Sequence, residues 1–393
     1  MAKIMKYIPK YGRFDDIFVL MDTPCEQKML SMAKKQLDAD IADMQCGKPI
    51  SLLAKWLPSV NTSSPDKREL AKKICHAWGM SEKKYRKMLA KLRSYIDVLE
   101  KRLCAMDYTF DYAVQPAKAM LQYRSAFMRN DGTRYLAYLE KVAEGKVKMN
   151  TGTLYPYEII RNFLTDDTHT EEEIRALDVT WNALPEIKNQ TNSIAVVDGS
   201  GSMYWSQGSI LPAHVALSLG MYFAEKCQGH FHNHFITFSY NPRLIEIQGQ
   251  NIAEKLDYCM SFDECSNTDL EKVFRLILDT AVQNHLPQSE MPENIYVISD
   301  MEFDTQCDNS TTLFRSMKKL YAENGYQLPT IIYWNVNCRN LQFPVTMNES
   351  GAVLVSGCSP SIFDMAVSGE YVTPYMMMRQ VLDSERYCDI AVA

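Results

Sequence analysis

The residues best suited to chemistry follow a short apolar run. Residues 194–203 read IAVVDGSGSM, so the carboxylate of Asp198 is followed by two hydroxyls, Ser200 and Ser202, each preceded by a glycine. Two hydroxyls two residues apart, beside a carboxylate, could serve a cation or a phosphate group. Which of the two they bind decides most of what the sequence says about function.

Known phosphate and nucleophile motifs do not fit this loop. A P-loop needs a lysine after its glycines, and none is present. A nucleophile elbow needs glycine two residues before its serine, where Asp198 stands before Ser200. An aspartyl-phosphate enzyme would need a second aspartate in place of Ser200. A divalent cation held by hard oxygens is the interpretation that remains, and Mg²⁺ suits hydroxyl ligands backed by carboxylates.

The elements that must position these side chains are strands alternating with helices. Apolar runs at 193–198, 234–239, 243–248, 294–300, 330–336 and 351–357 predict strands, and helices are expected near 209–226, 269–284, 311–324 and from about 360. Strands without polar alternation, separated by helices, are typical of a mostly parallel sheet covered on both faces. Asp198 and Asp300 each end such a strand, at the edge where these sheets bind ligands.

This set of residues resembles a known metal site. Asp198 to Ser202 match the D-x-S-x-S motif of von Willebrand factor A domains, whose metal-ion-dependent adhesion site (MIDAS) adds a threonine and an aspartate from two further loops. Thr268, before a helix, and Asp300, at a strand end, fill those positions in order. The resemblance implies a Rossmann-like A domain binding Mg²⁺ or Mn²⁺. Ser200, Ser202 and Thr268 would bind the ion directly or through water, and Asp198 and Asp300 mostly through water.

The wider architecture is also similar to known proteins. The Ro autoantigen proteins pair a ring of helical repeats (TROVE domain) with an A domain and bind small noncoding RNAs. Closer still is a family of bacteria, plants and large viruses with an N-terminal helical domain and a C-terminal A-like domain. The segments SLLAKWLPS, YRKMLAKLRSYIDVLEKRL, TWNALPEI and VISDMEF resemble segments of that family and spread over most of the chain. Membership of that family implies no established activity.

The first half of the chain reads as helices. Apolar spacing of three to five residues predicts helices over 24–46, 67–79, 116–129, 131–144 and 155–164, and a long one from Ser81 to about 108. The chain turns acidic and then polar over 165–190. We therefore expect an all-α, HEAT-like domain at 1–185 and the A-like domain at 186–393.

Charge divides the chain along the same line. Residues 1–150 carry 28 Lys and Arg against 17 Asp and Glu, whereas the whole chain has a net charge of −6. The basic half bears interspersed tyrosines, a combination that favours nucleic-acid binding through phosphates and base stacking. A solvated helix surface is the competing interpretation. The basic residues singled out for nucleic acid are Lys83, Lys84, Arg86, Lys87, Lys91 and Arg93.

These features together predict a cytoplasmic binding or scaffold protein without catalytic residues. The expected partners are a protein that offers the cation a carboxylate or another oxygen, and a noncoding RNA on the basic helices. No apolar run reaches the roughly 18 residues of a membrane span, and eleven scattered cysteines without C-x-x-C favour reduced thiols. The alternatives are a divalent-metal-dependent hydrolase and a structural component of a larger assembly such as a viral particle.

Overall fold

The computed structural model divides into two compact units. It describes residues 7, 11–96, 98–165, 169–186, 192–205, 210–262, 269–301, 310–337, 352–357, 362 and 374–388. The first unit comprises Met1–Tyr108 with Thr373–Ala393, and the second comprises Thr109–Val372.

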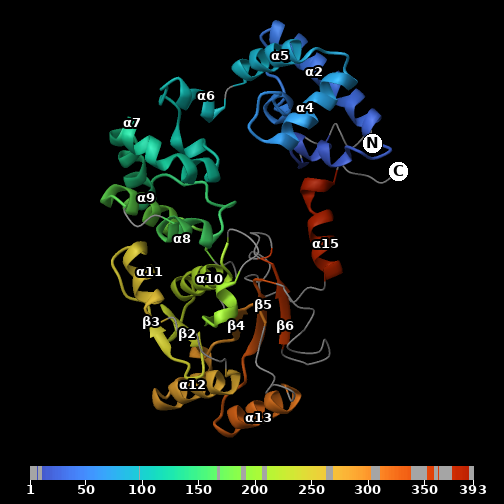
Figure 1. Ribbon diagram of the computed structural model, residues 1–393. Coiled ribbons are helices and arrows are strands. Elements are labelled where there is room, and N and C mark those ends of the chain that lie inside the picture. The colour runs from blue at the N-terminus through green and yellow to red at the C-terminus, as the bar shows by residue number, and fades with distance from the viewer. Residues whose placement is uncertain are drawn as a thin grey trace. The chain divides into compact units, whose positions relative to one another are not determined.

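The first unit is helical. It contains η1 (Phe14–Leu20), α2 (Glu26–Gln45), α3 (Leu53–Trp56), α4 (Pro65–Ala77), α5 (Glu82–Tyr95), α6 (Leu99–Cys104), α15 (Pro374–Leu382) and η6 (Glu385–Tyr387) (Figure 1). Ser64 and Ser81 cap α4 and α5, since each side chain accepts a hydrogen bond from the backbone three residues on. Tyr387 of η6 stacks on Tyr11 with ring centroids 4.9 Å apart, which attaches the C-terminal segment to this unit.

The long helix expected from Ser81 is two helices. α5 ends at Tyr95, Ile96 is extended with φ −66° and ψ 124°, and Val98 is extended before α6 begins. Both residues are β-branched, and β-branched side chains lose rotamer freedom in a helix. The apolar stripe of the sequence continues through this break, which explains why its periodicity predicted a single helix.

The second unit combines three further helices with an α/β sheet. The helices are α7 (Ala117–Ala143), α8 (Pro156–Thr165) and α9 (Glu171–Asn182), with η2 (Tyr112–Val114) before them. α7 covers both helices predicted between 116 and 144, and the two meet at a kink where Asp131 has φ −146° and ψ 37°. The sheet has the strands β1 (Ser193–Asp198), β2 (His234–Phe238), β3 (Leu244–Glu246), β4 (Asn294–Ser299), β5 (Thr330–Asn335) and β6 (Ala352–Ser356).

The sheet is mostly parallel, as the sequence predicts. Its order is β3-β2-β1-β4-β5-β6, and only β3 runs antiparallel to its neighbour β2. β1 and β4 are central neighbours, with Val197 opposite Ile298. This register brings the carboxyl ends of β1 and β4 side by side, because parallel strands end at the same edge.

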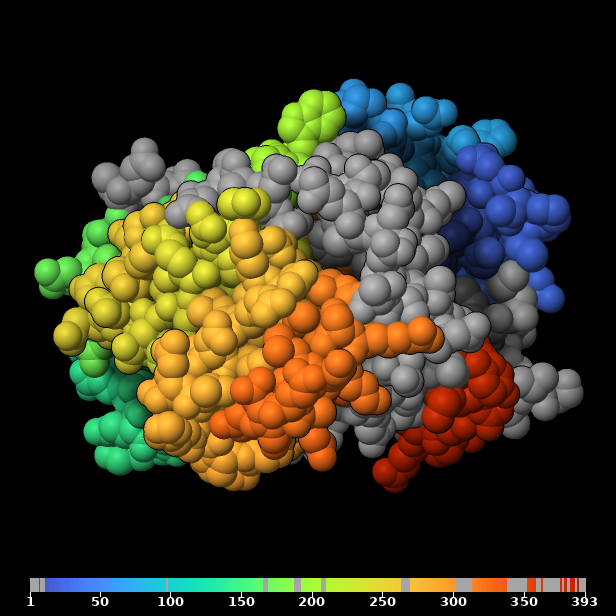
Figure 2. All heavy atoms as spheres, turned by 90° about the horizontal axis from the view of Figure 1, so that it is seen from below, coloured from blue at the N-terminus to red at the C-terminus, as the bar shows by residue number. Residues whose placement is uncertain are grey.

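Helices cover both faces of the sheet (Figure 1). Alternate residues of β1 belong to different cores: Ala195 and Val197 pack with α10 (Pro212–Lys226) and α11 (Ile252–Met260), whereas Ile194 and Val196 pack with α12 (Leu270–Gln283) and α13 (Ser310–Glu323). Figure 2 shows the gold α12 beside the orange α13 on the outer surface of the helix layer that packs on Ile194 and Val196. The remaining short elements of this unit are η3 (Gly201–Tyr204) and η4 (Gln288–Glu290).

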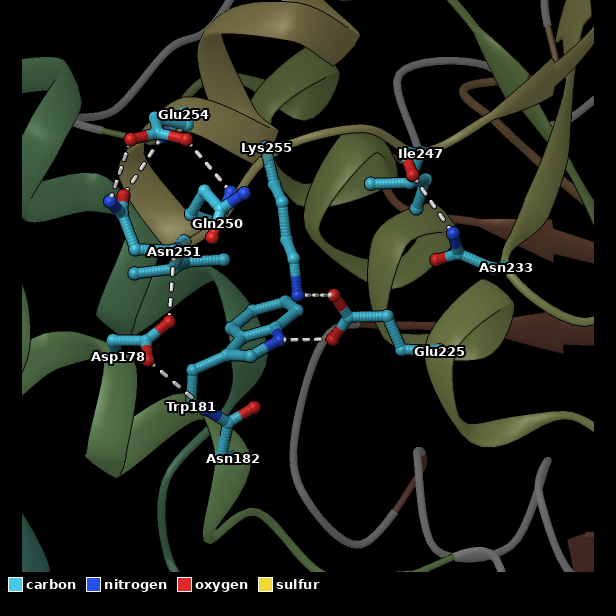
Figure 3. A network of polar contacts seen from close by, with 11 residues as sticks. Asp178, Trp181, Asn182, Glu225, Asn233, Ile247, Gln250, Asn251, Glu254 and Lys255 are labelled. Atoms are coloured by element: carbon cyan, nitrogen blue, oxygen red, sulfur yellow. Dashed lines mark hydrogen bonds and ion pairs between the residues drawn. The ribbon is translucent and has the colours of Figure 1, made fainter. Parts of the chain in front are cut away.

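A polar network joins α9 to the α/β part of the same unit (Figure 3). Glu225 of α10 accepts hydrogen bonds from the indole of Trp181 at 2.5 Å and from Lys255 of α11 at 2.7 Å. Asp178 accepts a hydrogen bond from the backbone N–H of Ile252 at 2.9 Å, at the start of α11. Burial raises the pKa of Asp178. α9 is therefore bonded to two helices of the α/β layer.

The bonds of α9 to α10 and α11 affect where the chain divides into compact units. The predicted boundary at 185/186 falls between α9 and β1, where the structure changes from helices to sheet. The compact units divide instead after Tyr108 and after Val372, because α7, α8 and α9 pack with the sheet layer. No helix among the described residues is long and apolar enough to cross a membrane.

Candidate metal centre

Asp198 ends β1 and is held in one position by two neighbours. Its carboxylate is nearly inaccessible, at 2% relative exposure. One oxygen accepts a hydrogen bond from the backbone N–H of Ser200 at 2.8 Å, and the other accepts from the Ser299 hydroxyl. Both donors are neutral, so neither of them balances the negative charge of the carboxylate.

The two serines of the loop point their hydroxyls at the same place. The Oγ atoms of Ser200 and Ser202 lie 3.1 Å apart. The loop turns at once into η3, where the N–H of Met203 donates to the carbonyl of Ser200 at 3.0 Å and the Met203 side chain is fully buried. That buried side chain anchors the loop beneath the two hydroxyls.

Asp300 follows β4, next to the end of β1. It is 3% exposed, and its negative charge is among the causes that raise the pKa of Asp198. The next residue, Met301, has φ 63°, a left-handed conformation that is uncommon outside glycine, and its N–H donates to the Ser299 hydroxyl at 3.0 Å. Ser299 thus contacts both strand ends, which fixes the Asp198 and Asp300 loops relative to each other.

The electrostatics of Asp198 follow from this geometry. Burial is the largest influence and raises the pKa of Asp198, the hydrogen bonds from Ser299 and Ser200 lower it, and Asp300 raises it again. The net result is a pKa of about 6. The Asp198 carboxylate therefore binds a proton readily, and a divalent cation could take the place of that proton.

One distance in the loop is compatible with a magnesium ion. Mg²⁺ holds six oxygens at about 2.1 Å in an octahedron, so neighbouring ligand oxygens are about 3.0 Å apart. The hydroxyls of Ser200 and Ser202 are hydrogen-bonded to each other at 3.1 Å, a separation that is also close to one edge of that octahedron. The parts of the chain that the structure describes contain no group of three or more His, Cys, Asp or Glu side chains suited to a metal. A site here must use hydroxyl ligands together with the two carboxylates.

The structure brings together four of the five residues predicted for the site. Asp198, Ser200, Ser202 and Asp300 come from the ends of the neighbouring strands β1 and β4. Thr268 lies outside the described residues. Ser299 was missed by the sequence reasoning, although it directly precedes Asp300 at the end of a strand. Its role depends on the register between β1 and β4, which no motif specifies.

Exposed aromatic side chains follow the neighbouring strands β1 and β2. Tyr204 ends η3, Trp205 follows it, and the two are 37% and 71% exposed. Tyr240 follows β2 and is 59% exposed, with the Lys272 ammonium 3.4 Å from its ring centroid. Aromatic side chains of this kind are common energetic centres of protein interfaces.

The basic residues predicted for nucleic acid belong to α5 in the first unit. Lys83, Lys84, Arg86, Lys87 and Lys91 are exposed, opposite a buried face that includes Tyr85.

Arg93 differs from these five. Its guanidinium donates to the carbonyls of Ala54 and Leu57 and to the Ser59 hydroxyl, at 2.5–2.8 Å. Arg93 therefore ties α5 to the end of α3, and these contacts occupy the groups that a phosphate would need.

Most tyrosines of the basic region are unsuited to stacking on bases. Five of them are buried in the protein interior: Tyr85, Tyr108, Tyr112, Tyr135 and Tyr138. Tyr112, Tyr135 and Tyr138 pack on one another and on Phe127. The interpretation of these side chains as a stacking surface is wrong, because they are core residues.

Comparison with known proteins gives matches to both parts of the chain. Residues 192–385 match the family described as Domain of unknown function (DUF7788), and residues 76–192 match Domain of unknown function (DUF2828). An uncharacterised protein of Acanthamoeba polyphaga mimivirus is 30% identical over 382 residues, which cover 92% of this chain and 65% of that protein. The chain thus spans somewhat less than two thirds of that relative's length.

Comparison with solved structures also gives matches, of which one is a bacterial protein. The crystal structure of the Deinococcus radiodurans RO (RSR) protein aligns with 85% of this chain and 71% of its own, with a TM-score of 0.42 and 11% identity. The fold of this chain is a helical N-terminal region followed by a mostly parallel six-stranded α/β sheet.

Proposed function

We propose that the carboxyl edge of the sheet is an A-domain metal site that holds Mg²⁺ or Mn²⁺ and binds an oxygen of a partner protein. The observation that carries the proposal is the meeting of Asp198, Ser200, Ser202 and Asp300 at two adjacent strand ends. Ser200 and Ser202 would ligate the ion, with Thr268 as the third expected ligand. Asp198 and Asp300 would supply negative charge and orient bound water.

A binding role follows from the kind of ligands in the site. Hydroxyls leave the ion with most of its positive charge, so the ion keeps a strong affinity for an additional anionic oxygen. A carboxylate from a partner would supply that oxygen. The exposed aromatics Tyr204 and Trp205 follow the Asp198 loop in the sequence, Tyr240 follows the neighbouring strand β2, and all three offer apolar contact area to the same partner.

Thermal unfolding of the whole protein with and without divalent cation tests this function. Mg²⁺ at ten times its Kd should stabilise the wild type by about 1.4 kcal/mol, which raises the Tm of a unit this large by roughly 2–4 °C per kcal/mol. Ser200→Ala with Ser202→Ala should remove the shift, while Ser316→Ala on the exposed face of α13 should keep it. Absence of any shift in the wild type with either Mg²⁺ or Mn²⁺ would overturn the proposal.

The basic side chains of α5 favour a second function, binding to RNA. Five exposed basic side chains on one helix form a surface that can contact a phosphate backbone. Each phosphate contact with a single strand contributes a slope of about 0.7 to the dependence of log K on log salt. Lys83→Ala with Lys87→Ala should therefore reduce the slope for single-stranded RNA by about 1.4.

A matched pair of lysines controls this measurement. Lys146→Ala with Lys148→Ala removes two exposed charges that lie after α7 and should leave the slope unchanged. Equal effects of the two pairs would show general charge attraction and would remove α5 as the RNA site. The hydrolase and assembly interpretations stay predictions of the sequence.

A further inference from the structure

A pocket opens beside the candidate cation site. It holds about 510 Å³ of space measured out to its open mouth. Its walls come from the end of β1, from β2, and from α10 and α11, and Asp198 and Gly199 belong both to this wall and to the cation loop. The apolar part of the wall includes Val197, Ala213, Leu217, Phe235, Phe238 and Phe262.

Ser239 gives this pocket a polar group that has no hydrogen-bond partner among the described residues. The residue follows β2, is 2% exposed, and its hydroxyl makes no hydrogen bond within the described part of the chain. Nearby hydroxyls are satisfied: Thr237 accepts from the N–H of Arg243 at 3.0 Å, and Ser218 of α10 donates to the carbonyl of Val215 at 2.7 Å. A buried hydroxyl left unbonded destabilises the fold, so its presence in a pocket wall points to a ligand atom as its partner.

The other polar groups in the wall carry no charge near neutral pH. Burial lowers the pKa of the half-buried His214 imidazole, and burial raises the pKa of the Cys259 thiol to about 12. Apart from Asp198, the pocket therefore offers apolar surface and neutral hydrogen-bonding groups. Such a wall favours an uncharged group with one polar atom over an ionised one.

The size and the rim favour a side chain of a protein as the occupant. The enclosed space is about 40 Å³, which limits the occupant to a single side chain. Tyr204 and Met260 line the pocket and are 37% and 39% exposed, so apolar surface continues from the pocket to the outside. An aromatic anchor in a pocket, surrounded by apolar contacts, is the usual energetic centre of a protein interface.

We infer that this pocket binds an aromatic side chain bearing one hydrogen-bonding atom, as in tyrosine, and that the partner supplies this side chain close to the acidic residue that ligates the cation. The aromatic ring fills the apolar wall, and its polar atom pairs with the Ser239 hydroxyl. The pairing with an acidic residue rests on the proposed metal-dependent function. Binding of the ring itself does not depend on that function.

Binding of p-cresol to the full-length protein in EDTA, followed by ligand-observed NMR, tests the pocket alone. Wild type should bind p-cresol more tightly than toluene, which lacks the hydroxyl. Ser239→Ala should weaken p-cresol binding about five-fold, equivalent to roughly 1 kcal/mol, and leave toluene unchanged. Ala213→Leu, which fills the pocket, should weaken both. Equal affinity of wild type and Ser239→Ala for p-cresol would overturn the inference.

Thermal stability gives an independent readout of the same serine. Because the structure gives the Ser239 hydroxyl no partner in the part of the chain that it describes, Ser239→Ala should keep or raise the Tm of the ligand-free protein. The matched variant Ser218→Ala, which loses a made hydrogen bond, should lower it. A lower Tm in Ser239→Ala, similar to that of Ser218→Ala, would show that the hydroxyl has a structural role and would contradict the inference.

The link to the cation is tested with 3-(4-hydroxyphenyl)propanoate, which joins the same ring to a carboxylate. It should bind more tightly than p-cresol in Mg²⁺ and lose this advantage in EDTA. A Tm shift with Mg²⁺ but no binding of p-cresol would overturn the pocket and leave the proposed function intact. Binding of p-cresol without any effect of Mg²⁺ would leave the pocket intact and overturn both the proposed function and the pairing.

Discussion

At the scale of single residues, the buried carboxylate of Asp198 is the group of the site that most clearly destabilises the folded protein. Its carboxylate is buried next to Asp300, and its two hydrogen-bond donors are neutral. The resulting pKa of about 6 means that the proton and a cation compete for the same carboxylate. This competition makes the proposed cation binding dependent on pH in a range that is easily measured.

We expect Mg²⁺ affinity to fall about ten-fold between pH 7.5 and 5.0, because one pH unit below the pKa of about 6 most of the Asp198 side chain is protonated. The Tm shift caused by a fixed Mg²⁺ concentration should therefore be smaller at pH 5.0. In Asp198→Asn, which cannot titrate, any residual shift should be the same at both pH values. An equal shift in the wild type at both pH values would contradict this prediction.

In the metal-free protein, protonation of Asp198 should have the opposite effect, because it stabilises the folded state at low pH. The pKa of Asp198 is raised in the folded state above the unfolded value of about 3.9. The folded state therefore holds the proton more tightly, and this contribution to stability is fully present below about pH 4 and is lost as pH rises through about 6. In EDTA, Asp198→Asn should therefore gain stability relative to wild type between pH 4 and 7, as urea denaturation at several pH values would show.

Residue types predicted which side chains meet at this strand edge, and their role as a metal site stays a prediction. The spacing of Asp198, Ser200 and Ser202, together with Asp300 at a strand end, was enough to predict that they share one edge of a parallel sheet. Ser299 could not be predicted, because its bond to Asp198 depends on the register of β1 against β4. The unbonded Ser239 was equally invisible, since only the fold shows which hydroxyls have partners.

At the scale of elements, Arg93 shows how one side chain joins two helices. It leaves α5 and donates to carbonyls at the end of α3, groups that a helix end leaves without partners. Arg93→Met should lower the free energy of unfolding of the first unit by about 2 kcal/mol, since hydrogen bonds from a charged donor are lost. Arg86→Met on the exposed face of the same helix should change it by less than about 0.5 kcal/mol. Urea denaturation followed by circular dichroism measures both, and similar values for the two variants would contradict the assigned role.

The network between α9, α10 and α11 is the corresponding connection in the second unit (Figure 3). The indole of Trp181 donates to Glu225, which also pairs with Lys255. A double-mutant cycle of Trp181→Phe and Glu225→Gln should give a coupling energy of about 1–2 kcal/mol, because the bond is buried and its acceptor is charged. Additive effects of the two substitutions would show that the bond does not stabilise the unit.

Periodicity predicted which segments form helices and strands better than where they end. The break between α5 and α6 escaped prediction because the apolar positions stay in phase across Ile96 and Val98. The kink at Asp131 lies one residue after the break that the sequence predicted, since the predicted helices were 116–129 and 131–144. In both cases the backbone conformation at one or two residues decided the outcome.

At the scale of the whole molecule, the change from helices to sheet does not coincide with the division into compact units. The sequence changes character near residue 185, and the sheet begins at Ser193. The second compact unit nevertheless begins at Thr109, because α8 and α9 bury apolar side chains against α10. Tertiary packing of this kind has no signature in local composition, so the sequence alone could not predict the division.

This packing predicts which fragments fold. Residues 109–372 retain Ile159, Ile160, Leu177 and Trp181, which are at most 1% exposed and belong to the same core as α10. A fragment of 186–393 loses these side chains and exposes the surface of α10 that they cover. We expect 109–372 to unfold in one cooperative thermal transition and 186–393 to bind the dye ANS and aggregate, because exposed apolar surface of that extent drives association. Cooperative unfolding of 186–393 with the same Tm as 109–372 would show that α7, α8 and α9 are dispensable for the sheet, and would place the folding boundary where the sequence composition changes.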